Sequence, residues 1–255
     1  MTKTQNLFYS CVDSRIQDQG SMYARFHLGT FFRGQALTFA NAIRRTLLSE
    51  IPGVVITDVA IEGASHEFAT LPGVEESVFD IILNLKKLVF SPTIKNVTEL
   101  ENFQATGYLK KEGPASITAA DFKFPPTVKC IDPDAPIATL TTGAKFAVSL
   151  DLCFMHPHHQ KIGDENNKKT QPSQTKIPTL SLETIPLPVQ KVNYVIKSLN
   201  AAQGSEYVVL EVWTNGSITP QASVQFALKN LTQLFFQFAE RSKQEASLVQ
   251  ESGSN

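Results

Sequence analysis

Residues 35–51, QALTFANAIRRTLLSEI, decide the fold of this chain. Apolar residues return at every third or fourth position of this stretch, which is the spacing of a helix with one buried face. Gly34 precedes the stretch and Pro52-Gly53 ends it, as expected at the two ends of a helix. The sequence therefore predicts a long amphipathic helix with an apolar face made of Ala36, Ala40, Ile43, Leu47 and Ile51.

A second long amphipathic helix is predicted near the other end of the chain. Thr219 can cap it, Pro220 suits its first turn, and helical spacing continues to about residue 244. Its apolar positions come close to a heptad seam, so this face can pack on the chain's own sheet or pair with a second copy. The seam consists of Val224, Ala227, Leu228, Leu231, Leu234, Phe235 and Phe238.

The remaining segments predict one more helix and a set of strands. The helix spans 73–88, where the early Glu75 and Glu76 suit the N-terminal end of the helix dipole. A short helical turn is predicted within 113–122. Strands and helices mixed in this way are typical of the α+β class. The predicted strands are 22–31, 54–63, 103–109, 127–131, 145–155, 192–199 and 207–213.

The composition argues against several classes of protein. With 23 Lys and Arg against 24 Asp and Glu, the 255-residue chain has a formal net charge of −1 and lacks the basic stripe that nucleic-acid binders carry. Its three cysteines form no Cys-x-x-Cys pair, so we expect no disulfide scaffold and no cysteine zinc site, and a reducing compartment fits. We expect no membrane span, no secretory leader and no transit peptide.

The sequence contains no phosphate-binding loop and no nucleophile elbow. His66-Glu67 resembles the start of a zinc-protease helix, but Thr70 stands where the second histidine is needed. Three more histidines border a hydrophilic segment, 157–178, which we expect to be a mobile loop that cannot fix ligand geometry. We therefore predict no catalytic and no metal site. The three histidines are His156, His158 and His159.

Three interpretations of function stay open from the residues alone. One is a docking protein, because Arg44 and Arg45 lie beside the apolar Leu48 on the first helix, and arginine is enriched in interface cores. Another is a DNA-binding transcription factor, which the near-zero net charge disfavours. The last is a free-standing dimeric metal-dependent enzyme with ligands at His66 and Glu67, or at His156 and His158.

Five stretches occur in an order that is specific to one protein family. They are RGQALTFANAIRRTLLSEIPG (33–53), ITDVAIEGASHEFATLPGVEESVFDIILNLKKL (56–88), GPASITAAD (113–121), VNYVI (192–196) and LEVWTNGSITP (210–220). Together they resemble the α subunit of multisubunit DNA-directed RNA polymerase of bacterial and plastid type, over nearly the whole chain. The forms CVDSR (11–15), RGQA (33–36) and EVWTNGS (211–217) look more like plastid members.

This resemblance implies a fold of two subdomains and a role in assembly. Residues 1–52 and 179–246 would form a dimerisation domain, 53–178 a mostly β insertion, and 247–255 a polar tail. Two α chains would pair and then recruit the β and β′ large subunits, while a σ-type factor joins indirectly and DNA is contacted through the complete enzyme. The catalytic magnesium belongs to a large subunit in this family, so the resemblance implies no cofactor in this chain.

The resemblance also carries over individual residues. The positions that match large-subunit contacts are Arg44, Arg45, Leu48, Asp80 and Lys86. The expected dimer interface consists of Phe39, Ile43, Leu47, Leu228, Leu231, Leu234, Phe235 and Phe238.

The ends of the chain and its setting complete the expectations from the resemblance. Bacterial members continue into a small domain that touches promoter DNA, whereas this sequence stops at Asn255, so we do not expect that function here. The expected location is the plastid, with the bacterial cytoplasm as the alternative.

Overall fold

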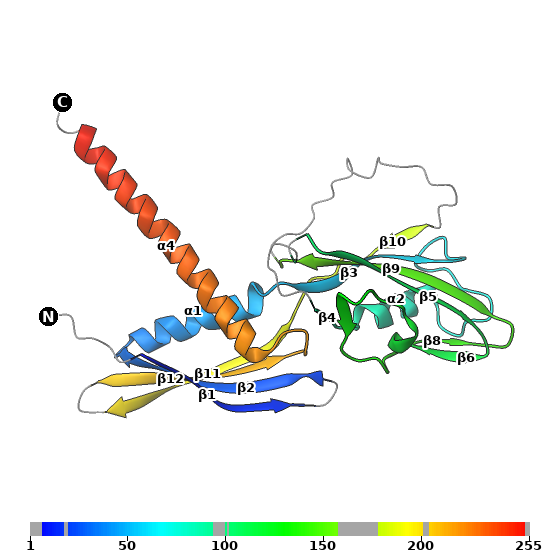
Figure 1. Cartoon of the computed structure of the whole chain (residues 1–255), viewed down its shortest axis with the longest axis horizontal. Helices are drawn as coiled ribbons and strands as arrows, with labels where there is room; N and C mark the ends of the chain where they lie inside the picture. Colours follow the sequence, from blue (N-terminus) through cyan, green and yellow to red (C-terminus); the bar gives the residue numbers. More distant parts are fainter. Residues whose placement is uncertain are drawn as a thin grey trace.

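The computed structural model is an elongated α+β molecule in which two larger antiparallel sheets lie end to end (Figure 1). A small two-stranded sheet accompanies the second of them. The class predicted from the sequence, α+β, is confirmed. The structure describes residues 7–17, 20–93, 100, 102–157, 178–200 and 204–252.

The first sheet joins strands from both ends of the chain in the order β1-β2-β12-β11, each antiparallel to its neighbour. Two helices, α1 (Gln35–Ser49) and α4 (Pro220–Ser252), lie on one face of this sheet (Figure 1). The order leaves β1 and β11 as the two edges. The strands are β1 (Phe8–Ile16), β2 (Met22–Phe32), β11 (Val189–Asn200) and β12 (Ser205–Thr214).

Helix α1 lies where the sequence predicted a helix, and the chain's own sheet covers its apolar face. Ala36, Ala40 and Ile43 are 0% exposed, and Leu47 is 1% exposed. Gly34 precedes the helix with a φ of 89°, a left-handed conformation that glycine adopts without strain. This burial against β-strand side chains forms the core of the first sheet.

Helix α4 begins where predicted but ends later. The Ala222 amide donates a hydrogen bond to Thr219 Oγ1 at 3.2 Å, which confirms Thr219 as the cap. The predicted end near residue 244 is wrong, because the helix continues to Ser252. Glu, Ala, Leu and Gln in its last turns favour a helix, and no Gly or Pro interrupts them before Gly253. The expected polar tail, 247–255, is thus helical as far as Ser252.

The second sheet has the strand order β5-β9-β3-β4-β7, with β10 also paired to β3. It packs with the short helix α2 (Val78–Lys86) and the β6-β8 pair around a separate core, in which Val59, Ile81, Leu85 and Leu150 are 0% exposed. Its strands are β3 (Gly53–Ile61), β4 (Phe90–Pro92), β5 (Gln104–Glu112), β7 (Val128–Cys130), β9 (Lys145–Met155) and β10 (Thr179–Ser181). The pair consists of β6 (Ala115–Thr118) and β8 (Pro136–Leu140).

The predicted start of the second helix at residue 73 is wrong. Val74 makes an isolated bridge with Leu140 of β8 instead of starting a helix. The helix begins only at Val78, after Ser77, whose hydroxyl accepts a hydrogen bond from a backbone amide of the first turn. Glu76 does not serve the helix dipole either, because its carboxylate accepts bonds from the Thr139 amide at 2.7 Å and the Thr139 hydroxyl at 3.0 Å.

Residues 113–122, predicted as one short helical turn, divide into strand β6 and a 3-10 turn, η2 (Ala119–Asp121). Asp121 ends this turn and accepts hydrogen bonds from Lys111 Nζ at 2.7 Å and from the Thr118 amide at 3.0 Å. Both bonds stabilise the charged carboxylate and so lower the pKa of Asp121 from its ordinary value of 3.8. The bond from Lys111 has the larger effect.

We expect Asp121→Asn to lower the free energy of unfolding at pH 7 by about 0.5–1 kcal/mol, since the ion pair is partly exposed. A lowered pKa in the folded state stabilises it above the ordinary value of 3.8, and this stabilisation is lost as the pH falls through the lowered pKa. Urea titrations from pH 7 to pH 2 should therefore show the variant and the parent converging in acid. Glu112→Gln, which removes the more exposed pair with Lys145 at 3.4 Å, is the control and should change little.

The turn at residues 214–217, which leads from β12 to α4, packs against the second sheet. The Ser91 hydroxyl of β4 donates to the Ser217 carbonyl at 3.0 Å. Gly216 has a φ of 90°, and a Cβ built there would lie 2.4 Å from the Gly20 carbonyl oxygen and 3.1 Å from a methyl group of Ile131. Only glycine fits this junction, which holds the hairpin turn before β2 against the segment after β7.

We expect Gly216→Ala to destabilise the fold by several kcal/mol, because it adds a backbone clash to the cost of about 1 kcal/mol for an L-residue with positive φ. Gly204→Ala is the matched control, since Gly204 has a φ of 64° and no atom within 4 Å of a built Cβ. Thermal unfolding of both variants tests this, and equal losses would contradict a role for Gly216 in the junction.

Candidate assembly surface

The second half of α4 extends past the first sheet and carries large apolar side chains on its surface (Figure 1). Phe235 and Phe238 are 62% and 67% exposed, and Leu234 is 47% exposed. Leu228 and Leu231, earlier on the same side, are half-buried and pack against the core of the first sheet. We call these five residues the α4 seam. Monomeric soluble proteins seldom expose so much apolar surface along one helix, so the seam is a candidate contact.

The residues of α1 that the sequence assigned to a dimer interface lie elsewhere. Ile43 and Leu47 are 0% and 1% exposed within one chain, so a second copy cannot contact them, and their assignment is corrected. Phe39 is half-buried and packs on Phe31, with ring centroids 4.9 Å apart. Of the three α1 residues in the predicted interface, only Phe39 is accessible to a second copy.

The predicted large-subunit contacts on α1 form an exposed group. Arg44 and Arg45 are exposed, and Leu48 is 37% exposed beside them. Neither arginine forms an ion pair with any residue that the structure describes. Because the buried face of α1 fixes the helix on its sheet, these three side chains are presented to solvent on a rigid support.

The other two predicted contacts lie at opposite ends of α2. Asp80 is exposed in the first turn, where its carboxylate accepts a bond from the Ser77 hydroxyl at 2.6 Å. Lys86 is exposed in the last turn and lines a hollow of about 200 Å³ together with the apolar Ile185 and Leu187. The structure therefore does not bring Asp80 and Lys86 to one point, although both are available to a partner.

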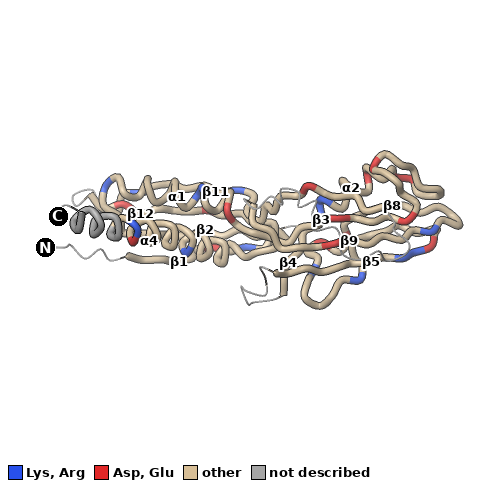
Figure 2. Tube along the Cα trace, turned by 90° about the horizontal axis from the view of Figure 1, so that it is seen from above, with Lys and Arg blue, Asp and Glu red and all other residues tan. Residues whose placement is uncertain are grey.

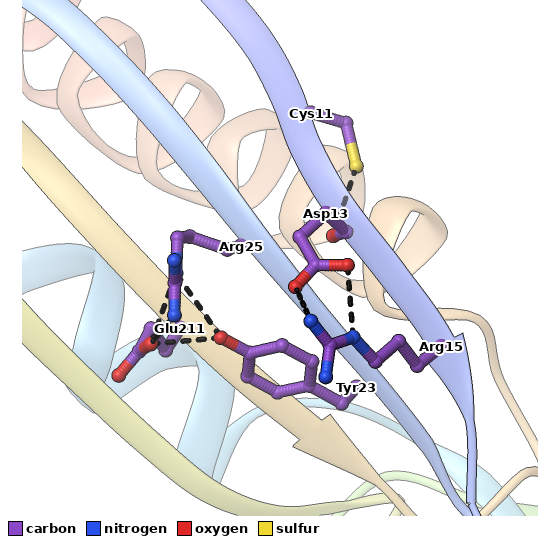
Figure 3. Close-up of polar contacts among 6 residues, drawn as sticks. All are labelled: Cys11, Asp13, Arg15, Tyr23, Arg25 and Glu211. Atoms are coloured by element: carbon purple, nitrogen blue, oxygen red, sulfur yellow. Dashed lines mark hydrogen bonds and ion pairs between the residues drawn. The ribbon is translucent and has the colours of Figure 1, made fainter.

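The face of the first sheet opposite the helices carries a polar network that sequence reasoning missed (Figure 3). Glu211 Oε1 on β12 accepts bonds from the Tyr23 hydroxyl at 2.7 Å and from Arg25 Nε at 3.1 Å, both on β2. Burial and the bond to Glu211 raise the pKa of Tyr23, and the bonds to Tyr23 and Glu211 raise that of Arg25. Alternation along each strand places these residues on one face, but only the pairing of β2 with β12 joins them.

A smaller polar group lies on the edge strand β1 (Figure 3). Arg15 pairs with Asp13 at 2.9 Å, and the Cys11 thiol donates to the Asp13 carbonyl oxygen at 3.6 Å. Of the other thiols, Cys153 is buried, and burial raises the pKa of Cys130. A raised pKa is the opposite of what a reactive thiol needs, so Cys130 is not a candidate nucleophile.

The histidines form no metal site in the part of the chain that the structure describes. His66 and Glu67 are exposed in the segment between β3 and α2. His158 and His159, like most of the predicted loop 157–178, lie outside the described residues. No described helix is long and apolar enough to cross a membrane.

Comparison with known proteins decides the family. Residues 59–155, which contain most of the second sheet, match the family described as RNA polymerase Rpb3/RpoA insert domain. The DNA-directed RNA polymerase subunit alpha of Chlorella vulgaris is 52% identical over 95% of this chain and 99% of its own length. The chain belongs to the α subunits of DNA-directed RNA polymerase. The subunits alpha of Synechococcus sp. strain JA-2-3B'a(2-13) and Cyanidium caldarium are 37% and 35% identical, over 64% and 71% of their own lengths.

Membership of this family gives the role of the chain. An α subunit is a non-catalytic part of the polymerase and works in its assembly with other subunits. The comparisons support neither the free-standing metal enzyme nor the DNA-binding transcription factor that the residues alone left open.

Proposed function

We propose that two copies of this α subunit pair through the α4 seam and that the dimer recruits the two large catalytic subunits. The observation that carries the proposal is the exposure of Leu234, Phe235 and Phe238 on a helix that has left its own sheet. A dimer that buries two such seams has an obligate interface of roughly 2,000 Å² or more. In this proposal, residues 1–52 and 179–246 form the pairing subdomain and 53–178 the insertion.

The partners of the dimer are the β and β′ type large subunits. Their contacts are Arg44, Arg45 and Leu48 on α1, and Asp80 and Lys86 on α2. Support comes from the exposure of all five side chains and from the lack of an ion-pair partner for either arginine among the described residues. A desolvated arginine at an interface is a frequent source of binding energy.

The rest of the proposal concerns the complete enzyme. The catalytic magnesium ion is held by a large subunit, a σ-type factor joins indirectly, and DNA is contacted by the complete complex. The location is the plastid. Support for this location comes from the relatives in the algae Chlorella vulgaris, Cyanidium caldarium and Guillardia theta.

We expect Phe235→Glu to convert the dimer into a monomer, because a charge without a partner would be buried in the seam. The fold of one chain should change little, since Phe235 is 62% exposed within it. Phe236→Glu is the matched control: Phe236 is 63% exposed but lies about 100° further around the helix, away from the seam. Sedimentation velocity tests both variants, and a dimer of normal stability for Phe235→Glu would show that the seam is misassigned.

We expect Arg45→Ala to leave the dimer intact and to weaken capture of a large subunit by about 2–5 kcal/mol, if the arginine is desolvated against a carboxylate. The free energy of unfolding should stay within about 0.5 kcal/mol of the parent, because the side chain is exposed. Affinity purification of tagged α subunit co-expressed with both large subunits gives the measurement. Lys229→Ala, at an exposed position of α4, is the control. Loss of folding in Arg45→Ala would instead make the arginine structural.

A further inference from the structure

The edge of the first sheet beside α1 has the features of a site for an added strand. Strand β11 pairs with β12 on one side, and no other described strand pairs with it on the other. Between the irregularities near its two ends, the register from Lys191 to Ser198 is continuous. A free edge of this length offers a row of main-chain donors and acceptors to an extended segment.

The flank of α1 beside this edge carries two leucines, an asparagine and an arginine at helical spacing. Leu37, Asn41, Arg44 and Leu48 recur at helical spacing on one side of α1, and Leu37 is 49% exposed. Asn41 Oδ1 accepts a bond from the Tyr194 hydroxyl of β11 at 2.7 Å, which places this flank next to the edge strand. Figure 2 likewise shows α1 running along β11 at the outer side of the sheet. We call this flank and the free edge of β11 the α1–β11 strip.

The other face of the edge also suits a mixed apolar and charged partner. Val195 and Leu199 of β11 are 53% and 56% exposed. Lys197 is exposed between them and forms no ion pair with any described residue. Lys191 is exposed beside Val195, with its ammonium 4.8 Å from the centroid of the Trp213 ring. A strand added here would place alternate side chains against α1 and alternate side chains beside Val195.

The charge of the strip has one sign. Helix α1 contains Arg44 and Arg45, strand β11 contains Lys191 and Lys197, and neither element contains an Asp or Glu. Lysines on an edge strand oppose pairing with a second positively charged edge, such as that of another copy, and favour an acidic segment.

We infer that the α1–β11 strip accepts an extended, acidic segment of a large polymerase subunit as an added β-strand. This inference rests on the proposed function, because Arg44 and Leu48 are also proposed contacts. It adds the mode of recognition: main-chain hydrogen bonds to β11, aliphatic side chains on Leu37 and Leu48, and carboxylates on the arginines and lysines.

Hydrogen exchange of the α subunit, alone and assembled with both large subunits, tests the main-chain bonds. Adjacent amides of a strand point to opposite edges, so every second amide from Lys191 to Ser198 faces the free edge. These amides should exchange fast in the α subunit alone and at least tenfold more slowly after assembly. Amides of β1, at the opposite edge of the sheet, should exchange equally in both samples.

Three results would overturn the inference. Unchanged exchange of β11 in an assembled polymerase would show that no strand is added, while the proposed function would stand. Protection of β11 already in the α subunit alone would show that the edge is covered by a second copy. Failure of the large subunits to co-purify with the parent chain would instead refute the proposed function itself.

A pair of variants tests the side-chain part of the site. Leu37→Glu places a carboxylate where we expect aliphatic and acidic groups of the partner, and should reduce the co-purified large subunits at least tenfold. Phe236→Glu makes the same kind of change at an exposed apolar residue of α4, outside the strip, and should leave the yield unchanged. Equal yields for the two variants would contradict the inference.

Discussion

The surface of the first sheet depends on the burial of one face of α1. Ala36, Ala40 and Ile43 are completely buried against the strands, so this face of α1 has no surface left for a partner chain. Helix α4 must then find its place beside α1, where only its first turns, with Val224 and Ala227, reach the core. Leu231 is the last residue of α4 that packs against this core. The exposed aromatic side chains of α4 lie on the turns that follow it.

The sequence predicts elements well where each has its own pattern of burial. The helical spacing of α1 and α4 can be recognised in the sequence because one side of each helix packs on an apolar sheet. Strand β1 has no such pattern, since nearly all its side chains are exposed, and only its pairing with β2 defines it. The predicted start of α2 is wrong because a local pattern is present but a contact distant in sequence replaces it. Val74 has helical spacing to Val78, but it pairs with Leu140, whose proximity depends on the tertiary fold.

Some residues of the candidate site could be predicted from local sequence patterns, and others depend on the tertiary fold. Arg44, Arg45 and Leu48 could be singled out because neighbouring positions on a helix share a surface. Periodicity shows that a residue such as Ile43 faces apolar surroundings, but not whether these belong to its own chain or to a second copy. The structure assigns Ile43 to its own chain. The network of Tyr23, Arg25 and Glu211 could not be predicted, because it joins strands from the two ends of the chain.

The net charge is near zero, but the charged residues are unevenly distributed over the first sheet and its helices. This distribution separates the proposed binding of a large subunit from the proposed pairing of two chains. Acidic residues are absent from α1 and β11, which lie at one edge of the first sheet, while β1 forms the other edge. The α4 seam continues beyond the sheet, so pairing of two chains and binding at the α1–β11 strip need not compete. A two-fold dimer presents two identical strips, yet the proposed large subunits are different chains. Because the α surface is the same on both sides, the choice between the two positions must come from the large subunits, which can use different parts of one rigid surface.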